Sequence, residues 1–145
     1  MEKEIIKKIQ KRVIKLLRKY SNKPLYITSA DNCSEIARLV GYWIFEKIPQ
    51  SKIFILKGKK VKRTKKCHDI LAVECKNSIS LIDPTVWQFF RNKRSIFIKT
   101  TKNMVNSLFE ANKIYGGNWK ISETFKINDY KKNDLEKMIA SNIEK

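Results

Sequence analysis

Four consecutive apolar residues, 53–56, constrain the fold more than any other feature of the sequence. An apolar run without alternation is typical of a strand that is covered on both faces, so residues 52–56 predict a central strand. Helical patterns lie before and after this region, over residues 2–20, from Asn32 onward, over 102–114 and over 134–143. This order of elements predicts an α+β fold.

Apolar residues recur at helical spacing over residues 2–20, and lysine and arginine occupy the other positions. We expect the apolar side to face the core, whereas the basic side could contact phosphates, an acidic protein or a membrane surface. The second helix should begin at Asn32, with Glu35 completing a capping box. Trp43 is expected in the core, and residues 25–27 could form a short extended stretch.

Two further strands are expected over residues 68–75 and 79–83, joined as a hairpin by the short turn at 76–78. In that register Leu71 faces Asp83, so His68 is offset by three positions and needs a bulge or a longer turn to reach Asp83. Residues 95–99 predict another strand, and residues 119–127 are extended or irregular.

The length of 145 residues predicts a single domain. Its parts would be a basic helix (1–20), a core (29–99) that includes the candidate catalytic residues discussed below, and a C-terminal helical part (100–145). Lysine and arginine number 32 against 14 acidic residues, a net charge of +18 that indicates an anionic partner. No apolar run approaches the roughly 18 residues of a membrane span, and no signal peptide is visible. We therefore expect a cytoplasmic protein, or an effector domain delivered into the cytoplasm of a target cell.

The chain has three cysteines, Cys33, Cys67 and Cys75, an odd number that argues against a disulfide framework. Cys67 and His68 are adjacent and would point to opposite faces of a strand, which disfavours a shared metal ion. We expect neither a metal nor a cofactor, and we expect Cys67 and Cys75 to be half-buried bystanders.

Cys33 is expected at the start of a helix, where unpaired N–H groups and the helix dipole stabilise a thiolate and can hold an oxyanion. Its neighbours Asn32, Ser34 and Glu35 are polar, although a buried structural cysteine is the alternative. His68 is the one histidine and opens a strand, and Asp83 ends the next. A thiol, an imidazole and a carboxylate are the groups that covalent attack on a carbonyl requires.

A cysteine at a helix start, a histidine on a strand and an aspartate before Pro84 and Thr85 on the next strand resemble the papain-like and transglutaminase-like cysteine enzymes. That superfamily includes bacterial papain-like toxins and protein glutaminases. The resemblance covers residues 29–90. It implies a core in which the helix bearing the cysteine packs on a small antiparallel sheet bearing the histidine and the aspartate.

The resemblance also implies roles for these residues. Cys33 would be the nucleophile, His68 the general base and then the acid, and Asp83 the group that orients His68. An oxyanion-hole side chain is expected near the nucleophile, and the candidates for it or for substrate contact are Asn32, Ser29, Gln10, Gln88 and Trp87. Trp87, together with Phe89 and Phe90, could line a cleft beside Asp83 or pack on the core.

The segment 57–66 is a basic loop that leads directly into His68, and we expect it to bind anions near the site or to be simply solvated. Its candidate anion-binding residues are Lys59, Lys60, Lys62, Arg63, Lys65 and Lys66. The first hypothesis is a thiol enzyme that acts on an amide as a protease, deamidase or transglutaminase, of the kind that occurs as a bacterial toxin or effector domain. Its partner would be an acidic protein, either a substrate or a neutralising inhibitor. The alternatives are a basic nucleic-acid-binding protein or RNA-cleaving toxin, and a domain that only binds an acidic protein.

Overall fold

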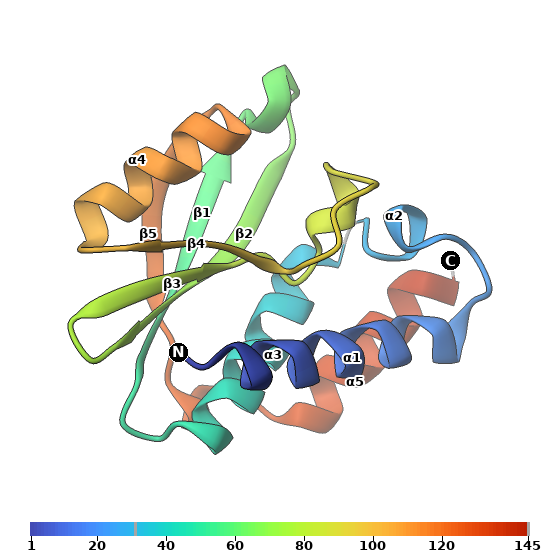
Figure 1. The fold of residues 1–145 in the computed structure, drawn as a ribbon. Helices are drawn as coiled ribbons and strands as arrows, with labels where there is room; N and C mark the ends of the chain where they lie inside the picture. Colours follow the sequence, from blue (N-terminus) through green and yellow to red (C-terminus); the bar gives the residue numbers. More distant parts are fainter. Residues whose placement is uncertain (31, 145) are drawn as a thin grey trace.

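The computed structural model describes residues 1–30 and 32–144, in which a five-stranded sheet is flanked by helices (Figure 1). The strands are β1 (Lys52–Lys59), β2 (Cys67–Cys75), β3 (Ser78–Ile82), β4 (Phe97–Thr101) and β5 (Asn118–Thr124). The helices are α1 (Lys3–Tyr20), α2 (Leu25–Thr28), α3 (Cys33–Lys47), α4 (Met104–Tyr115) and α5 (Lys132–Glu144). The strand order is β4-β3-β2-β1-β5 with antiparallel pairing throughout, so the expected α+β class is confirmed.

Each face of the sheet has its own apolar cluster. Ile53 and Ile55 of β1 belong to the cluster that includes α1, α3 and α5, and Leu56 belongs to the cluster that includes α4. Figure 1 shows α4 on one side of the sheet and the three long helices on the other. The central, two-faced position predicted for this strand is confirmed, because β1 pairs with β2 on one side and β5 on the other.

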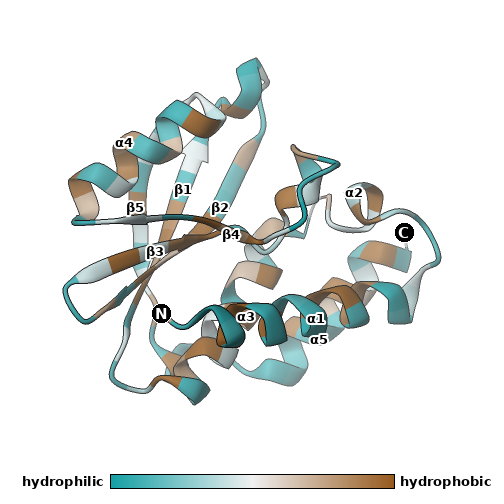
Figure 2. Cartoon of the chain, viewed as in Figure 1, coloured by the Kyte–Doolittle hydropathy of each residue, from teal (hydrophilic) through white to brown (hydrophobic). Residues whose placement is uncertain are grey.

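Helix α1 places its apolar side in the core, as predicted from its spacing. Ile6, Ile9, Val13 and Leu17 are buried. The hydrophilic outer side of α1 is visible in Figure 2. Since the apolar side packs on the rest of the protein, it is not free to insert into a membrane. None of the helices in the described part of the chain has both the length and the apolar character that crossing a bilayer requires.

The register of the β2–β3 hairpin differs from the prediction by one residue. Leu71 lies opposite Ile82, and the turn contains two residues, Lys76 and Asn77, with φ of 49° and 61°. Two successive residues at positive φ form the tight turn that suits the twist of a hairpin. The predicted three-residue turn was therefore wrong.

Three local predictions were also wrong. Residues 25–27 lie in the helical turn α2 and are not extended. The side chain of Asn32 precedes α3 but makes no capping hydrogen bond, so the capping box with Glu35 does not form. The segment 100–145 is not only helical, because β5 pairs with β1; of this segment, Lys145 lies outside the described residues.

Candidate active site

His68 and Asp83 form a buried pair that joins β2 to the end of β3. The imidazole Nε2 lies 2.8 Å from Asp83 Oδ2, and neither side chain is exposed to solvent. Asp83 is held by further donors: the Tyr115 hydroxyl donates to Oδ2 at 2.5 Å, and the Thr85 backbone N–H donates to Oδ1 at 3.1 Å. A carboxylate fixed by several donors can hold one orientation of the imidazole.

The observed hairpin register explains how His68 reaches Asp83. Continuing the register past Leu71 and Ile82 places Asp83 beside Ile70, and His68 precedes Ile70 by two residues on β2. Residues two apart in a strand share one face, so His68 and Asp83 are diagonal neighbours on the face toward α4. The one-residue correction thus removes the need for the bulge that the predicted register required.

Cys33 is the first residue of α3, and its side chain is half-buried. It lies close enough to His68 to be one of the groups that raise the pKa of the imidazole. Nδ1 of His68 is buried and makes no hydrogen bond within the described residues, so the approach of the thiol is near but not yet a formed hydrogen bond. A loose nucleophile–base contact is common before a substrate binds.

The charge state of His68 is set by opposing effects. Burial lowers its pKa, whereas the negative charge of Asp83, the hydrogen bond to Asp83 and the Cys33 side chain raise it, to about 10. His68 is therefore an imidazolium at neutral pH. Burial raises the pKa of Tyr115 above its ordinary value, so its hydroxyl remains a donor to Asp83.

Aromatic side chains enclose the imidazole. Phe89 packs edge-on against His68 with ring centroids 4.7 Å apart, and the rings of Tyr115 and Trp119 lie at 5.4 and 6.4 Å. Trp119 also donates its indole N–H to the carbonyl of Gly116 at 2.8 Å. This enclosure keeps water from the His68–Asp83 pair, which strengthens their electrostatic interaction.

Gly58 makes room for this enclosure, and we expect alanine there to destabilise the protein by about 1–3 kcal/mol. Gly58 lies opposite both His68 and Trp119, and a Cβ at this position would lie 2.4 Å from the indole ring. Gly41→Ala is the matched control, because its Cβ would meet Phe125 at 3.4 Å and alanine gains about 1 kcal/mol of helix propensity. Urea unfolding of both variants checks this, and an unchanged free energy of unfolding for Gly58→Ala would contradict the packing argument.

Most of the polar candidates for the oxyanion hole make hydrogen bonds to other residues of the protein. Asn32 donates to the Thr28 carbonyl at 3.0 Å and accepts from Asn142 at 3.0 Å, and the Ser29 hydroxyl donates to the Leu25 carbonyl at 2.5 Å. Gln10 holds the chain that leads into β4, through hydrogen bonds with the Arg94 carbonyl and the Ile96 N–H.

Gln88 and Trp87 lie on the turn that follows Asp83. Trp87 is packed in the main core and donates its indole N–H to the Lys93 carbonyl at 3.0 Å, so it lines no cleft. The Oε1 atom of Gln88 is buried and has no hydrogen-bond partner among the described residues. This oxygen accepts hydrogen bonds and cannot stabilise an oxyanion; the donor for that role would be the amide nitrogen of Gln88.

The basic loop between β1 and β2 lies next to this aromatic enclosure. Val61 of this loop is fully buried. The backbone φ angles of Lys60, Lys62 and Arg63 are positive, at 59°, 53° and 59°. The ammonium of Lys62 lies 4.3 Å from the centre of the Phe90 ring, and Phe90 contacts Tyr115. The other basic candidates of the loop, Lys59, Lys65 and Lys66, are exposed.

Sequence reasoning missed Tyr115 and Trp119. Both come from the second half of the chain, and neither is part of a motif. Cys67 and Cys75 are free thiols; Cys75 is half-buried as expected, but Cys67 is exposed, so the prediction of a half-buried side chain was wrong for Cys67. Among the described residues, no group of three histidine, cysteine or acidic side chains is arranged to hold a metal ion.

Comparison of the chain with protein-family models, with curated proteins and with solved structures found no match. The function of the protein is therefore inferred from the geometry described above.

Proposed function

We propose that the protein is a thiol enzyme of the papain-like and transglutaminase-like type, which acts on an amide bond through a thioester. The observation that carries this proposal is the buried His68–Asp83 pair, which has an unpaired imidazole Nδ1 and Cys33 close to it at the start of α3. A buried imidazolium–carboxylate pair beside a cysteine at a helix N-terminus can activate the thiol. Burying two charges costs free energy of desolvation, and a purely structural role would not require that cost.

In the first half of the reaction, the Cys33 thiolate attacks the amide carbonyl carbon and a C–S bond forms. The carbonyl oxygen becomes an oxyanion, which the first backbone N–H groups of α3 can stabilise because the Asn32 side chain does not cap them. The His68 imidazolium then donates its proton to the leaving nitrogen as the C–N bond breaks, which leaves a thioester on Cys33 and a neutral imidazole.

In the second half, His68 takes a proton from the incoming water or amine, which attacks the thioester carbonyl. The C–S bond breaks, and the products are a carboxylic acid or a new amide, with the thiolate–imidazolium pair restored. Asp83 stabilises the imidazolium each time it forms. Gln88 is our candidate for a side-chain donor to the oxyanion.

The charge around the site supports an acidic protein as the substrate or as a neutralising inhibitor. The basic loop reaches the aromatic residues that enclose His68, through Lys62 and Phe90. Negative side chains flanking the target amide would be drawn to this loop. Such a partner would suit a toxin or effector domain.

Binding of nucleic acid is the second candidate function, and the exposed side of α1 favours it. Its exposed basic residues are Lys3, Lys7, Lys8, Lys11, Arg12, Lys15, Arg18 and Lys19. Affinity for RNA that falls steeply with salt would support this candidate, and affinity that ignores salt would contradict it.

The proposed reaction can be tested with acidic, glutamine-containing peptides and added methylamine as an acyl acceptor. Mass spectrometry separates peptide cleavage, conversion of glutamine to glutamate, and incorporation of methylamine. We expect one of these products from the wild type, with an acyl adduct on the peptide that contains Cys33. Cys33→Ala should fold normally and form no product, and equal product formation by this variant would contradict the proposal.

A further inference from the structure

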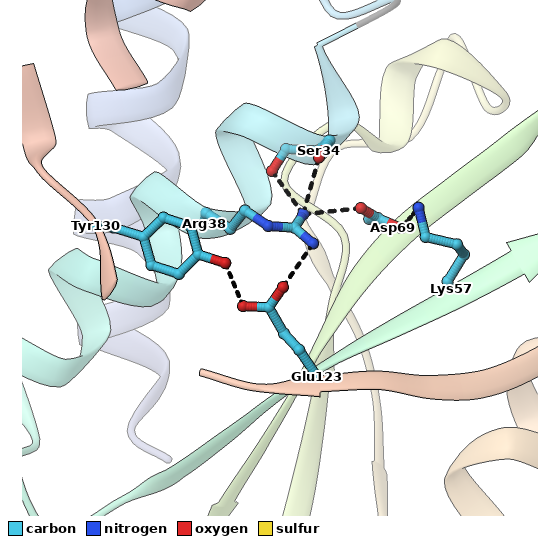
Figure 3. A network of polar contacts seen from close by, with 6 residues as sticks. All are labelled: Ser34, Arg38, Lys57, Asp69, Glu123 and Tyr130. Atoms are coloured by element: carbon cyan, nitrogen blue, oxygen red, sulfur yellow. Dashed lines mark hydrogen bonds and ion pairs between the residues drawn. The ribbon is translucent and has the colours of Figure 1, made fainter. Parts of the chain in front are cut away.

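Arg38 joins the two halves of the candidate active site through their immediate neighbours (Figure 3). Its Nη1 donates to the Ser34 hydroxyl at 2.9 Å and to Asp69 Oδ2 at 2.8 Å. Ser34 follows Cys33 in the first turn of α3, and Asp69 follows His68 in β2. One guanidinium group therefore ties the turn that carries the nucleophile to the strand that carries the base.

The link is largely shielded from solvent. The Arg38 side chain is 13% exposed and Asp69 is 1% exposed, so the pair is worth more than a surface ion pair and is poorly replaced by water. Asp69 also lies 3.3 Å from the ammonium of Lys57, its partner on β1. The carboxylate that receives Arg38 is thus itself fixed to the centre of the sheet.

The second terminal nitrogen of the Arg38 guanidinium group, Nη2, has a different partner. Nη2 of Arg38 donates to Glu123 Oε1 on β5 at 2.9 Å, and the Tyr130 hydroxyl donates to the other oxygen of Glu123 (Figure 3). This branch anchors Arg38 to the edge strand but touches no residue next to Cys33 or His68. The network therefore has one branch toward the catalytic pair and one branch that only anchors it.

From this division we infer that Arg38 is a positioning residue, which sets the approach of the Cys33 thiol to His68 by clamping Ser34 to Asp69. The inference rests on the proposed function. No side-chain cap holds the N-terminus of α3, and Nη1 of Arg38, which binds both Ser34 and Asp69, is a polar contact that fixes its first turn on β2. Lysine carries one charged centre and cannot bridge Ser34, Asp69 and Glu123 in this way.

The test measures the alkylation rate of Cys33 by iodoacetamide against pH, read by mass spectrometry on the full chain. Variants that break the catalytic branch, Arg38→Met and Asp69→Asn, should slow alkylation near pH 6 by about tenfold or more, because small displacements of a reacting pair have large effects on rate. Arg38→Lys should lie between wild type and Arg38→Met. Glu123→Gln keeps an acceptor but removes the negative charge, so it weakens only the anchoring branch; it should lower the melting temperature while leaving the rate within about twofold.

Each outcome decides the inference. If Arg38→Met and Asp69→Asn react at the wild-type rate, or if Glu123→Gln slows alkylation as much as they do, the positioning role is overturned. If Arg38→Met does not fold, the alkylation rates of the isosteric variant Asp69→Asn and of Ser34→Ala are sufficient to test the positioning role. If His68→Ala leaves wild-type alkylation unchanged, the proposed function fails and the inference with it; a response to His68→Ala but not to the Arg38 and Asp69 variants overturns only the inference.

Discussion

Asp83→Ala should lower the free energy of unfolding by about 3–5 kcal/mol, the largest loss we expect from a single substitution in this protein. The change leaves the buried imidazole of His68 without its counter-charge and removes the acceptor of the Tyr115 hydroxyl. Both groups are enclosed by aromatic rings, so water cannot replace the lost carboxylate without opening the core. Urea unfolding monitored by circular dichroism at pH 6 measures the loss.

The loss should also depend on pH in a defined direction. The pKa of His68 is raised in the folded protein to about 10, from about 6.5 in the unfolded chain. Stability gained from the charged pair is therefore complete below about pH 6.5 and is lost as the pH rises through about 10. The difference between wild type and Asp83→Ala should shrink over the same interval.

A matched control separates this pair from an ordinary ion pair. Glu46 and Lys132 join α3 to α5 at 3.1 Å, and their side chains are 39% and 38% exposed. Glu46→Ala should change the free energy of unfolding by no more than about 1 kcal/mol. If Asp83→Ala is no more destabilising than Glu46→Ala, the His68–Asp83 pair does not have the buried, charged character described here.

The fold class was predictable because its signals are local. The unbroken apolar run at 53–56 required cover on both sheet faces, and the helical spacing of α1 marked its buried side, and both predictions are confirmed. The three residues Cys33, His68 and Asp83 were selected by residue type and by their expected places on elements, and the structure brings them together.

The details that shape the site were not predictable, because they depend on contacts between distant segments. The hairpin register was decided by Lys76 and Asn77 at positive φ, and neither is glycine, the residue that most often marks such a turn. Tyr115 binds Asp83 from 32 positions away in the sequence. Arg38 is one arginine in a strongly basic chain, and its role depends on Asp69 and Glu123, which lie on different strands.

His68→Ala should slow alkylation of Cys33 near pH 6 by about a hundredfold. Under the proposed function, the imidazolium of His68 is the counter-charge of the Cys33 thiolate, and the thiolate is the form that reacts. Without the imidazolium, the thiol should react at this pH like a free cysteine, whose pKa of about 8.5 leaves less than about one per cent as thiolate. Cys67 is exposed and serves as the internal control, because it is free in the same molecule.

The central claim, that Cys33 and His68 act as one unit, is tested most directly by this measurement. The alkylation rate of each cysteine is followed by mass spectrometry from about pH 5 to pH 9 in the wild type and in His68→Ala. The account predicts that Cys33 alone reacts rapidly at low pH in the wild type and loses that reactivity in the variant, while Cys67 is unchanged. A Cys33 that follows the same pH profile as Cys67 in the wild type, or that is indifferent to His68→Ala, would contradict it.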